Sequence, residues 1–205
     1  MNRKEHWENI YNTKQLNEVS WYQPTPQQSL DWIQRQFPHK DAAIIDIGGG
    51  DSFLPDHLID LGYSNITVLD ISERAIDRAK ERLGEKANKV NWVISDIIHF
   101  TPLHQYDGWH DRAAFHFLRD PQEIHAYKRL LESTLKTGGK AMIGTFSENG
   151  PLKCSGIEIQ QYSKDDFERI FGDGFEVGDL QNVDHPTPFN TTQNFNFIQL
   201  KLQKD

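Results

Sequence analysis

The stretch Ala-Ile-Ile-Asp-Ile-Gly-Gly-Gly at residues 43–50 decides the fold. Its first five residues form a short, largely apolar run that is typical of a strand buried on both faces. The glycines that follow allow a sharp turn and a close approach to a ligand, because they lack a Cβ and tolerate positive φ. A helix is predicted next, with Leu54, Leu58 and Leu61 on one face and Gly62 at its end. The stretch therefore predicts a strand, a turn and a helix, the unit that binds ligands in open α/β sheets.

Strand and helix signals alternate along the central part of the chain, from residue 41 to residue 146. Such alternation predicts parallel strands joined by right-handed crossovers, with helices on both faces of the sheet. The rhythm changes after residue 147, where a short helix precedes two strand-like runs at residues 175–183 and 195–202. We expect these runs to form a terminal hairpin that adds an antiparallel strand to the sheet.

Length and composition predict one soluble, cytoplasmic domain spanning residues 1–205. We divide it into an N-terminal cap (1–40), a cofactor-binding core (41–146) and an acceptor-side segment with the hairpin (147–205). The formal charge of −8 makes nucleic acid an unfavourable partner. The single cysteine, Cys154, excludes an intramolecular disulfide. No run approaches the roughly 20 apolar residues of a membrane span, so no membrane partner is expected.

Three acids end three successive predicted strands: Asp46, Asp70 and Asp96. Asp70 lies 20 positions after Gly50, where a carboxylate can accept hydrogen bonds from both hydroxyls of a ribose. At Asp96 the carboxylate can meet an adenine amino group while Ile97 packs on the ring. Each acid alone can equally cap the helix that follows it. All three together favour one crevice at the carboxyl edge of the sheet.

This arrangement resembles the class I S-adenosylmethionine-dependent methyltransferases, in which an acid and Gly-x-Gly-x-Gly precede an acid ending strand two and an Asp-apolar pair ending strand three. Ser52 stands where that pattern has its third glycine. The resemblance implies S-adenosylmethionine as cofactor and a Rossmann-like three-layer sandwich, with a seven-stranded, mostly parallel sheet whose last strand is antiparallel. The cofactor-binding residues it implies in this part of the chain are Asp46, Gly48, Gly49, Gly50, Asp70, Ile71, Asp96 and Ile97.

A finer resemblance lies at the fourth predicted strand, residues 106–110. Asp111-Arg112-Ala113 is similar to the Asp-Lys-Gly or Asp-Arg-Gly signature of a subgroup that includes citrate synthase and elongation factor lysine methyltransferases and thiopurine methyltransferases. It implies that Asp111 and Arg112 are the catalytic residues, with Asp111 also beside the cofactor and positioning the acceptor as an acid or base. The alternative is an ion pair between Asp111 and Arg112 that only shapes the loop.

The N-terminal segment also resembles that subgroup, whose N-terminal residues cap the cofactor. The resemblance rests on His6-Trp7, Tyr11 and Trp21-Tyr22. It implies that Tyr11 and Trp21 close over the cofactor, exclude water and offer aromatic faces to its sulfonium. The alternative is a purely hydrophobic contact that fastens the segment to the core.

The acceptor stays open between a protein lysine and a small molecule, including a thiol. Cys154 and the Gly150-Pro151 segment are candidates for lining the acceptor pocket, because regular structure is interrupted there, and the loop at residues 184–192 is a candidate gate for the acceptor. A lone cysteine is more often a small buried hydrophobe. His110 and His116 flank the loop of Asp111 and Arg112, but no third ligand in register accompanies them, so no metal site is predicted.

Two other functions compete with methyl transfer. A NAD(P)-dependent oxidoreductase also uses a Gly-x-Gly turn and an acid about 20 residues later. That fingerprint expects a further glycine where Phe53 stands, and it leaves Asp96 and Asp111-Arg112 unexplained. A non-catalytic cofactor-binding module would keep the same fold. Because the residues at the expected cofactor site are all of the appropriate type, the sequence favours an S-adenosylmethionine-dependent methyltransferase.

Overall fold

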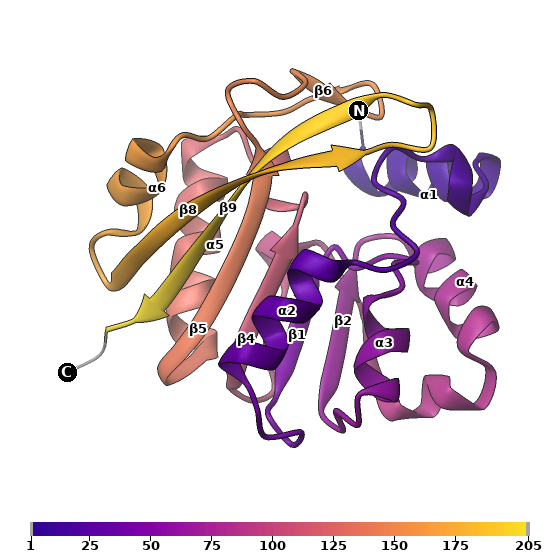
Figure 1. Ribbon diagram of the computed structural model, residues 1–205, viewed down its shortest axis with the longest axis horizontal. Coiled ribbons are helices and arrows are strands. Elements are labelled where there is room, and N and C mark those ends of the chain that lie inside the picture. Colours follow the sequence, from indigo (N-terminus) through magenta and orange to yellow (C-terminus); the bar gives the residue numbers. More distant parts are fainter. Residues whose placement is uncertain (1, 204–205) are drawn as a thin grey trace.

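A seven-stranded sheet organises the protein, whose computed structural model describes residues 2–203 (Figure 1). Its strands are β1 (Ile44–Ile47), β2 (Ile66–Asp70), β3 (Val90–Ile94), β4 (Tyr106–Arg112), β5 (Leu135–Phe146), β8 (Phe175–Pro186) and β9 (Thr192–Leu202). They lie in the order β3-β2-β1-β4-β5-β9-β8, with β1 to β5 parallel and β9 antiparallel to both β5 and β8. The predicted Rossmann-like sheet is therefore confirmed. A short hairpin of β6 (Lys153–Cys154) and β7 (Ile157–Glu158) stands apart from it.

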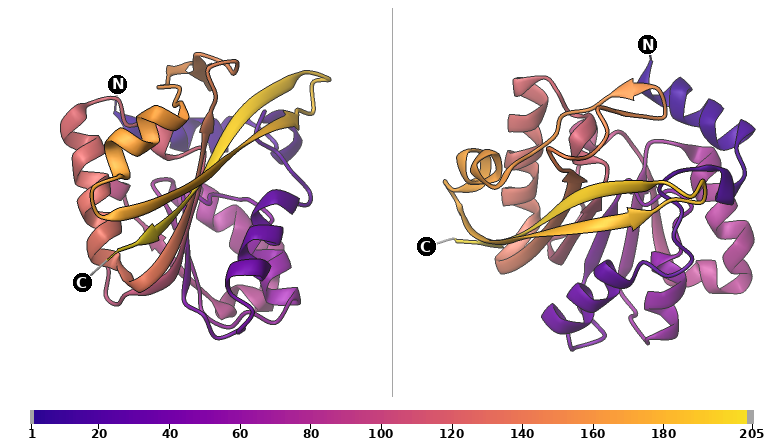
Figure 2. Two further views of the ribbon diagram at one scale, coloured as in Figure 1. Left: turned by 60° about the vertical axis from the view of Figure 1, so that its left-hand side comes forward. Right: turned by 45° about the horizontal axis from the view of Figure 1, so that its top comes forward.

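Helices cover both faces of this sheet (Figure 2). The α-helices are α1 (Arg3–Thr13), α2 (Gln27–Gln36), α3 (Leu54–Asp60), α4 (Glu73–Leu83), α5 (Pro121–Thr134) and α6 (Lys164–Phe171), and the 3-10 turns are η1 (Leu16–Glu18), η2 (Gly84–Lys89), η3 (Ile97–His99) and η4 (Phe115–Phe117). Successive strand residues point to opposite faces, so Ile44 packs with α2, α3 and α4 while Ile45 packs with α5 and α6. Strand order reverses between β1 and β4, and ligands bind beyond the carboxyl ends of strands at such a point.

The terminal hairpin is longer than predicted. Pairing between β8 and β9 continues to Pro186 and Thr192, so the turn contains only residues 187–191. The extension is polar: amides of neighbouring asparagines bond across it, as from Asn182 Nδ2 to Asn194 Oδ1 at 2.7 Å. Prediction from apolar patterning ended the strands too early for this reason. The hairpin tip reaches the N-terminal segment beside α1, where His185 Nε2 lies 2.7 Å from the Ser20 carbonyl (Figure 1).

The N-terminal segment is fastened across the carboxyl edge of the sheet. Glu8 of α1 accepts hydrogen bonds from the Ser72 hydroxyl and from the backbone N–H of Glu73 at 2.7 Å, at the start of α4. A carboxylate is favourable at a helix N-terminus because unpaired backbone N–H groups point toward it. From the same helix, Arg78 donates to the carbonyl of Tyr11 at 2.9 Å. These contacts hold α1 over the ends of β2 and β3.

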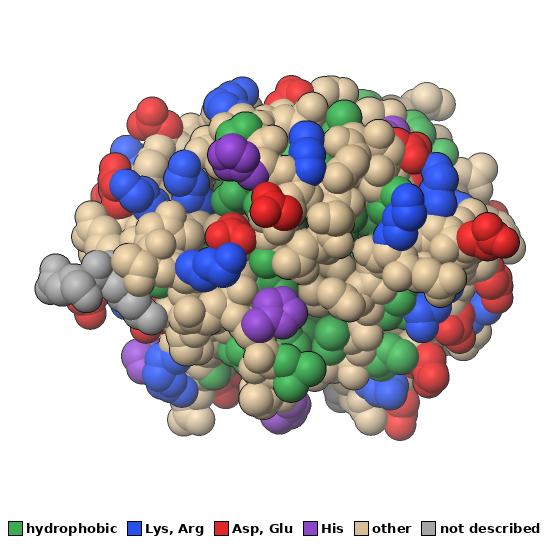
Figure 3. Space-filling view, turned by 90° about the horizontal axis from the view of Figure 1, so that it is seen from below, with side chains coloured by type: hydrophobic (Ala, Val, Ile, Leu, Met, Phe, Trp, Pro, Cys, Tyr) green, Lys and Arg blue, Asp and Glu red, His purple; other side chains and the backbone are tan. Residues whose placement is uncertain are grey.

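Charged side chains of both signs are interspersed on the face seen from below in Figure 3. Within residues 2–203, no helix is long and apolar enough to cross a membrane.

Candidate cofactor and acceptor site

Two adjoining cavities open at the carboxyl edge of β1, β2, β3 and β4. Tyr11, Trp21, Gly48 and Arg112 line both of them. The first cavity extends along the ends of β2 and β3 and also reaches β5, β6 and β9. The second lies beneath the glycine turn, beside α2 and the start of α3. All but two of the residues predicted to bind the cofactor or to act in catalysis line one cavity or the other. The exceptions are Gly50 and Asp111.

The glycine turn has the geometry expected of a close-approach site. Gly48 and Gly50 have φ of +62° and +50°, in the left-handed region that other residues rarely adopt. A Cβ added at Gly48 would lie 2.8 Å from the Ala114 Cβ, and one at Gly50 would lie 2.5 Å from the Tyr11 hydroxyl. Where the family pattern has another glycine, Ser52 donates its backbone N–H to the Gly49 carbonyl at 2.9 Å and closes the turn. The turn therefore requires glycine at Gly48 and Gly50.

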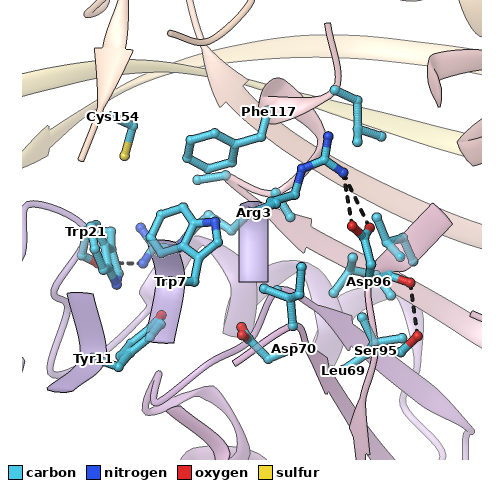
Figure 4. Close-up of a pocket in the computed structure, with 18 of the residues that line it drawn as sticks. Arg3, Trp7, Tyr11, Trp21, Leu69, Asp70, Ser95, Asp96, Phe117 and Cys154 are labelled. Atoms are coloured by element: carbon cyan, nitrogen blue, oxygen red, sulfur yellow. Dashed lines mark hydrogen bonds and ion pairs between the residues drawn. The ribbon is translucent and has the colours of Figure 1, made fainter. Parts of the chain in front are cut away.

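Asp70, at the end of β2, presents a buried carboxylate to the first cavity (Figure 4). Burial raises the pKa of Asp70 to about 7, against the stabilising hydrogen bond that its Oδ1 accepts from the Ser72 backbone N–H at 2.8 Å. A ligand that donates hydrogen bonds here would stabilise the ionised form. A ribose diol is such a ligand, so the site fits the nucleoside that the sequence predicts.

Asp96 makes two contacts, only one of which the sequence suggested. Its Oδ1 accepts from the Ile98 backbone N–H at 3.2 Å and caps η3, which was the structural alternative for this acid. Arg3 of α1 also reaches it, with Nη1 3.1 Å from Asp96 Oδ2 (Figure 4). The same guanidinium lies 2.8 Å from Glu123 Oε2. Arg3, absent from the sequence prediction, thus fastens α1 to the far side of the cavity.

An aromatic cluster from the N-terminal segment lies over the first cavity. The Trp7 ring lies 5.8 Å from that of Trp21 and 5.1 Å from that of Phe117, edge to face in each pair (Figure 4). Tyr11 is buried beside the glycine turn. The structure therefore brings Tyr11 and Trp21 to the predicted place, and their contact with the cofactor stays a prediction. Both alternatives raised by the sequence are compatible with this packing.

Arg112 is a partly buried cation without a carboxylate partner within residues 2–203. Its Nη2 donates to the Trp21 carbonyl at 2.7 Å, and no acid of the described chain lies within ion-pair distance. Burial lowers the pKa of Arg112 to about 10, while nearby Asp46 opposes that shift. The guanidinium is therefore protonated at neutral pH and lines both cavities with donors to spare.

The predicted place of Asp111 is wrong. Its side chain is fully buried and lines neither cavity. Oδ1 accepts from the Ala114 backbone N–H at 2.9 Å, and Oδ2 accepts from the Tyr127 hydroxyl at 2.7 Å. Because β4 continues through Arg112, the two neighbours point to opposite faces, and their predicted ion pair does not form. Asp111 therefore anchors the turn after β4. Its predicted roles as an acid or base that positions the acceptor, and as a cofactor contact, are not supported by this placement.

The part of the first cavity beyond Arg112 is mostly apolar, with Gln193 of β9 as a polar wall residue, and comes from widely separated segments. Its walls include Phe117, Phe146 and Phe195, with the thiol of Cys154 between them. Burial raises the pKa of Cys154 to about 12, so this thiol is neutral and no nucleophile. Cys154 lines the first cavity, and its place in an acceptor pocket stays a prediction. The loop of residues 184–192 lines neither cavity, and its expected role as a gate for the acceptor stays a prediction.

The two flanking histidines lie in separate environments. Burial lowers the pKa of His116 to about 3, and its Nδ1 accepts the Phe146 backbone N–H at 3.3 Å. His110 instead lies between two polar side chains: Nδ1 is 2.6 Å from Asp46 Oδ1, and Nε2 is 2.8 Å from Ser29 Oγ. The sequence analysis did not join these three residues, since Ser29 is on α2 and carries no motif.

Comparison with known proteins places this site in a family context. Residues 44–139 match the family described as methyltransferase domain. Malonyl-[acyl-carrier protein] O-methyltransferase 2 of Ilyobacter polytropus is 30% identical over 107 residues, which are 52% of this chain and 40% of that protein. EEF1A lysine methyltransferase 2 of Danio rerio is 24% identical over 85% of this chain and 75% of its own. The chain thus spans about 40% of the length of the first of these relatives.

Solved structures share the fold. The crystal structure of the N-methyltransferase NodS of Bradyrhizobium japonicum, in complex with S-adenosylhomocysteine, superposes with a TM-score of 0.73. The match covers 99% of this chain and all of that one at 12% identity, a level that establishes the fold alone. The methyltransferase match across residues 44–139 removes the support for a NAD(P)-dependent oxidoreductase.

Proposed function

The chain belongs to the class I S-adenosylmethionine-dependent methyltransferases, and on that premise we propose that it transfers a methyl group to a small, largely apolar acceptor. The observation that carries this proposal is the shape of the first cavity: acids line one end and aromatic rings the other. S-adenosylmethionine, when bound, supplies an electrophilic methyl group on its sulfonium. The protein must bind it, orient the acceptor and exclude water.

The acidic end suits the nucleoside of the cofactor. Asp70 would accept the ribose hydroxyls, and Asp96 with Ile97 and Ile71 would contact the adenine. The glycine turn, Gly48 to Gly50, would allow the cofactor close to the backbone. These roles are proposals, supported by the positions of the side chains around one cavity.

Arg112 suits the carboxylate at the amino-acid end of the cofactor. It is the partly buried cation that both cavities share, and no acid within residues 2–203 pairs with it. A cation that is partly shielded from water and has donors to spare would bind a carboxylate that enters with a ligand by charge-assisted hydrogen bonds. We therefore propose that Arg112 binds the cofactor and thereby orients its methyl group, which replaces the catalytic role first expected of this residue.

The aromatic end suits an apolar acceptor. Phe117, Phe146 and Phe195 would bury a hydrophobic molecule, and no carboxylate lines the cavity there to balance a protonated amine. The nearest thiol, Cys154, is neutral and would pack against the acceptor. This chemistry favours a small molecule over the protonated side chain of lysine.

A protein lysine is the second candidate. It is favoured by the lysine methyltransferase relative, whose alignment covers 75% of that protein. The stem of a lysine is apolar, so the aromatic end would also accept it in its neutral form.

A turnover assay separates these possibilities. The purified protein would be incubated with S-adenosylmethionine and release of S-adenosylhomocysteine measured with panels of small apolar thiols, amines and hydroxyl compounds, and with elongation factor 1A. Turnover with the small molecules alone supports the proposal, and turnover with elongation factor alone would replace it by lysine methylation. Cofactor binding without turnover in either panel would favour a non-catalytic module.

Three wider expectations stay predictions. Residues 1–205 are proposed to act as one methyltransferase domain, without a nucleic-acid partner. A cytoplasmic location is proposed as well, and cell fractionation would test it.

A further inference from the structure

A chain of three buried polar side chains lies beside the second cavity. Ser29 on α2, His110 on β4 and Asp46 on β1 are each at most 3% exposed. Asp46 and His110 are register partners on adjacent parallel strands, so their side chains point to the same face of the sheet. That face is covered by α2, which brings Ser29 against the imidazole. The fold therefore places all three together without any local sequence motif.

The hydrogen-bond pattern assigns the protons of this chain. If His110 is neutral and carries its proton on Nδ1, it donates to Asp46 Oδ1 and accepts from the Ser29 hydroxyl at Nε2. Every donor in the chain then has an acceptor. A doubly protonated imidazole would instead leave the Ser29 hydroxyl proton without a partner among the described residues. In this arrangement the imidazole is neutral and does not balance the negative charge of Asp46, which has the Arg112 guanidinium nearby.

The other oxygen of Asp46 faces the glycine turn. A Cβ added at Gly49 would lie 2.5 Å from Asp46 Oδ2, so this oxygen packs against a residue with no side chain. Oδ2 has no hydrogen-bond partner among the described residues, and both Asp46 and Gly49 line the second cavity. One oxygen is thus held by the imidazole, and the other is available to a ligand.

We propose that Ser29 and His110 are positioning residues that hold Asp46 so that its Oδ2 binds the α-ammonium group of the cofactor. This inference rests on the proposed function and extends it to two residues outside the family pattern. A carboxylate fixed in one rotamer and left anionic binds an ammonium group more strongly than a mobile one, because less conformational entropy is lost on binding. Together with Arg112 across the same cavity, the arrangement complements a zwitterionic amino acid.

The same three side chains also occur as a serine–histidine–aspartate triad in hydrolases, but the geometry here supports no hydrolysis. All three side chains line the second cavity, but the Ser29 hydroxyl, 1% exposed, is occupied by its hydrogen bond to His110 Nε2. Asp46 Oδ2 is the oxygen of the three side chains that has no hydrogen-bond partner among the described residues, so the ligand is expected there.

The test compares three ligands by calorimetry: S-adenosylhomocysteine, its deamino analogue that keeps the carboxylate, and 5′-methylthioadenosine, which lacks the whole amino-acid end. We expect the wild type to prefer S-adenosylhomocysteine over the deamino analogue by about 10- to 100-fold, the range for a hydrogen bond between charged groups. Asp46→Asn and His110→Leu should each lower this preference to within about threefold, with 5′-methylthioadenosine affinity almost unchanged. His110→Asn should retain it, since its amide N–H can replace the Nδ1 donor.

The outcomes are distinguishable. If the wild type binds none of the three ligands, the proposed function fails and this inference with it. If the wild type binds all three ligands but shows no preference for the amino group, the cofactor site stands and the inference is overturned. The same holds if His110→Leu weakens the binding of all three ligands equally. In an Asp46→Asn background, His110→Leu should have no further effect on the preference. Should His110→Leu fail to fold, Ser29→Ala decides: about threefold lower preference is expected, and an unchanged one overturns the proposal.

Discussion

The two halves of the sheet edge differ in chemistry and in how the chain builds them. The half formed by β1, β2 and β3 carries Asp46 on β1, Asp70 at the end of β2 and Asp96 two residues after β3. The half formed by β4, β5 and β9 presents aromatic rings and a single cation, Arg112, gathered from segments that are distant in sequence. The first suits a polar, hydroxyl-rich nucleoside, and the second an apolar molecule. The acidic half is thus built from a compact stretch of sequence, whereas the aromatic half is gathered from dispersed segments.

The largest effect on cofactor affinity is expected at the glycine turn after β1, which the cofactor is proposed to approach closely. Gly50→Ala would place a Cβ 2.5 Å from the Tyr11 hydroxyl at a positive φ, so S-adenosylhomocysteine affinity should fall on the order of 100-fold. Gly138→Ala is the matched control, because Gly138 has φ +73° but nothing within 4 Å of an added Cβ. Calorimetry on both variants measures the difference. Equal affinities would mean that the turn does not approach the ligand.

A second test addresses Asp70 itself. Asp70→Asn removes the charge that would accept the ribose hydroxyls, so 5′-methylthioadenosine affinity should fall about 30-fold at pH 8. Asp111→Asn is the comparison, since that carboxylate lies away from both cavities, and its effect on this ligand should stay within about threefold. A larger loss at Asp111 than at Asp70 would reverse the assignment of the two acids.

The pH dependence of the same ligand sharpens this test. Burial raises the pKa of Asp70 to about 7 in the free protein, and the ionised form is the better acceptor for hydroxyl groups. Affinity for 5′-methylthioadenosine should therefore be full above pH 8 and fall by up to about tenfold per unit as pH drops below 7. Asp70→Asn should give a flat profile over this range. A flat profile in the wild type would show that Asp70 does not titrate with binding.

Arg112 lies at the border of the two halves, and one variant decides to which it belongs. Arg112→Gln should weaken S-adenosylhomocysteine about 10- to 30-fold while leaving 5′-methylthioadenosine, which has no carboxylate, nearly unchanged. The two affinities give the answer without knowledge of the acceptor. If S-adenosylhomocysteine binds to Arg112→Gln as tightly as to the wild type, Arg112 belongs to the half formed by β4, β5 and β9 and does not bind the cofactor.

The smallest effect concerns the cap. Arg3→Gln removes the ion pairs to Asp96 and Glu123, which are partly exposed, so S-adenosylhomocysteine should dissociate about threefold faster. Lys4→Gln, one position along the exposed surface of α1, is the control and should leave the rate unchanged. Stopped-flow release measures both. A slower release of S-adenosylhomocysteine from Arg3→Gln would contradict the view that the ion pairs of Arg3 hold the N-terminal cap over the cofactor.

The features that could be predicted from the sequence are those that depend on residues close together in the chain. The acids at the strand ends and the glycine turn were placed correctly because strand, turn and helix are adjacent in the chain. Asp111 was misplaced because the strand signal ended at His110, whereas β4 continues to Arg112 and turns the carboxylate to the far face. Because side chains alternate between the two faces of a sheet, adding Asp111 and Arg112 to the strand fixes them on opposite faces.

Other features depend on contacts between distant segments. Arg3 meets Asp96 across 93 positions, and Ser29 meets His110 across 81, so no spacing rule could join them. The polar extension of the hairpin was also missed, because amide ladders carry no apolar signal. The half of the sheet edge formed by β1, β2 and β3 was therefore predictable to a greater degree than the half formed by β4, β5 and β9.

The most direct test of the central claim is calorimetric titration of the purified protein with S-adenosylmethionine, with NADH as the control ligand. The account predicts saturable binding of S-adenosylmethionine at one site per chain, weakened by Asp70→Asn, and no binding of NADH. Binding of NADH alone, or S-adenosylmethionine affinity that is indifferent to Asp70, would contradict it.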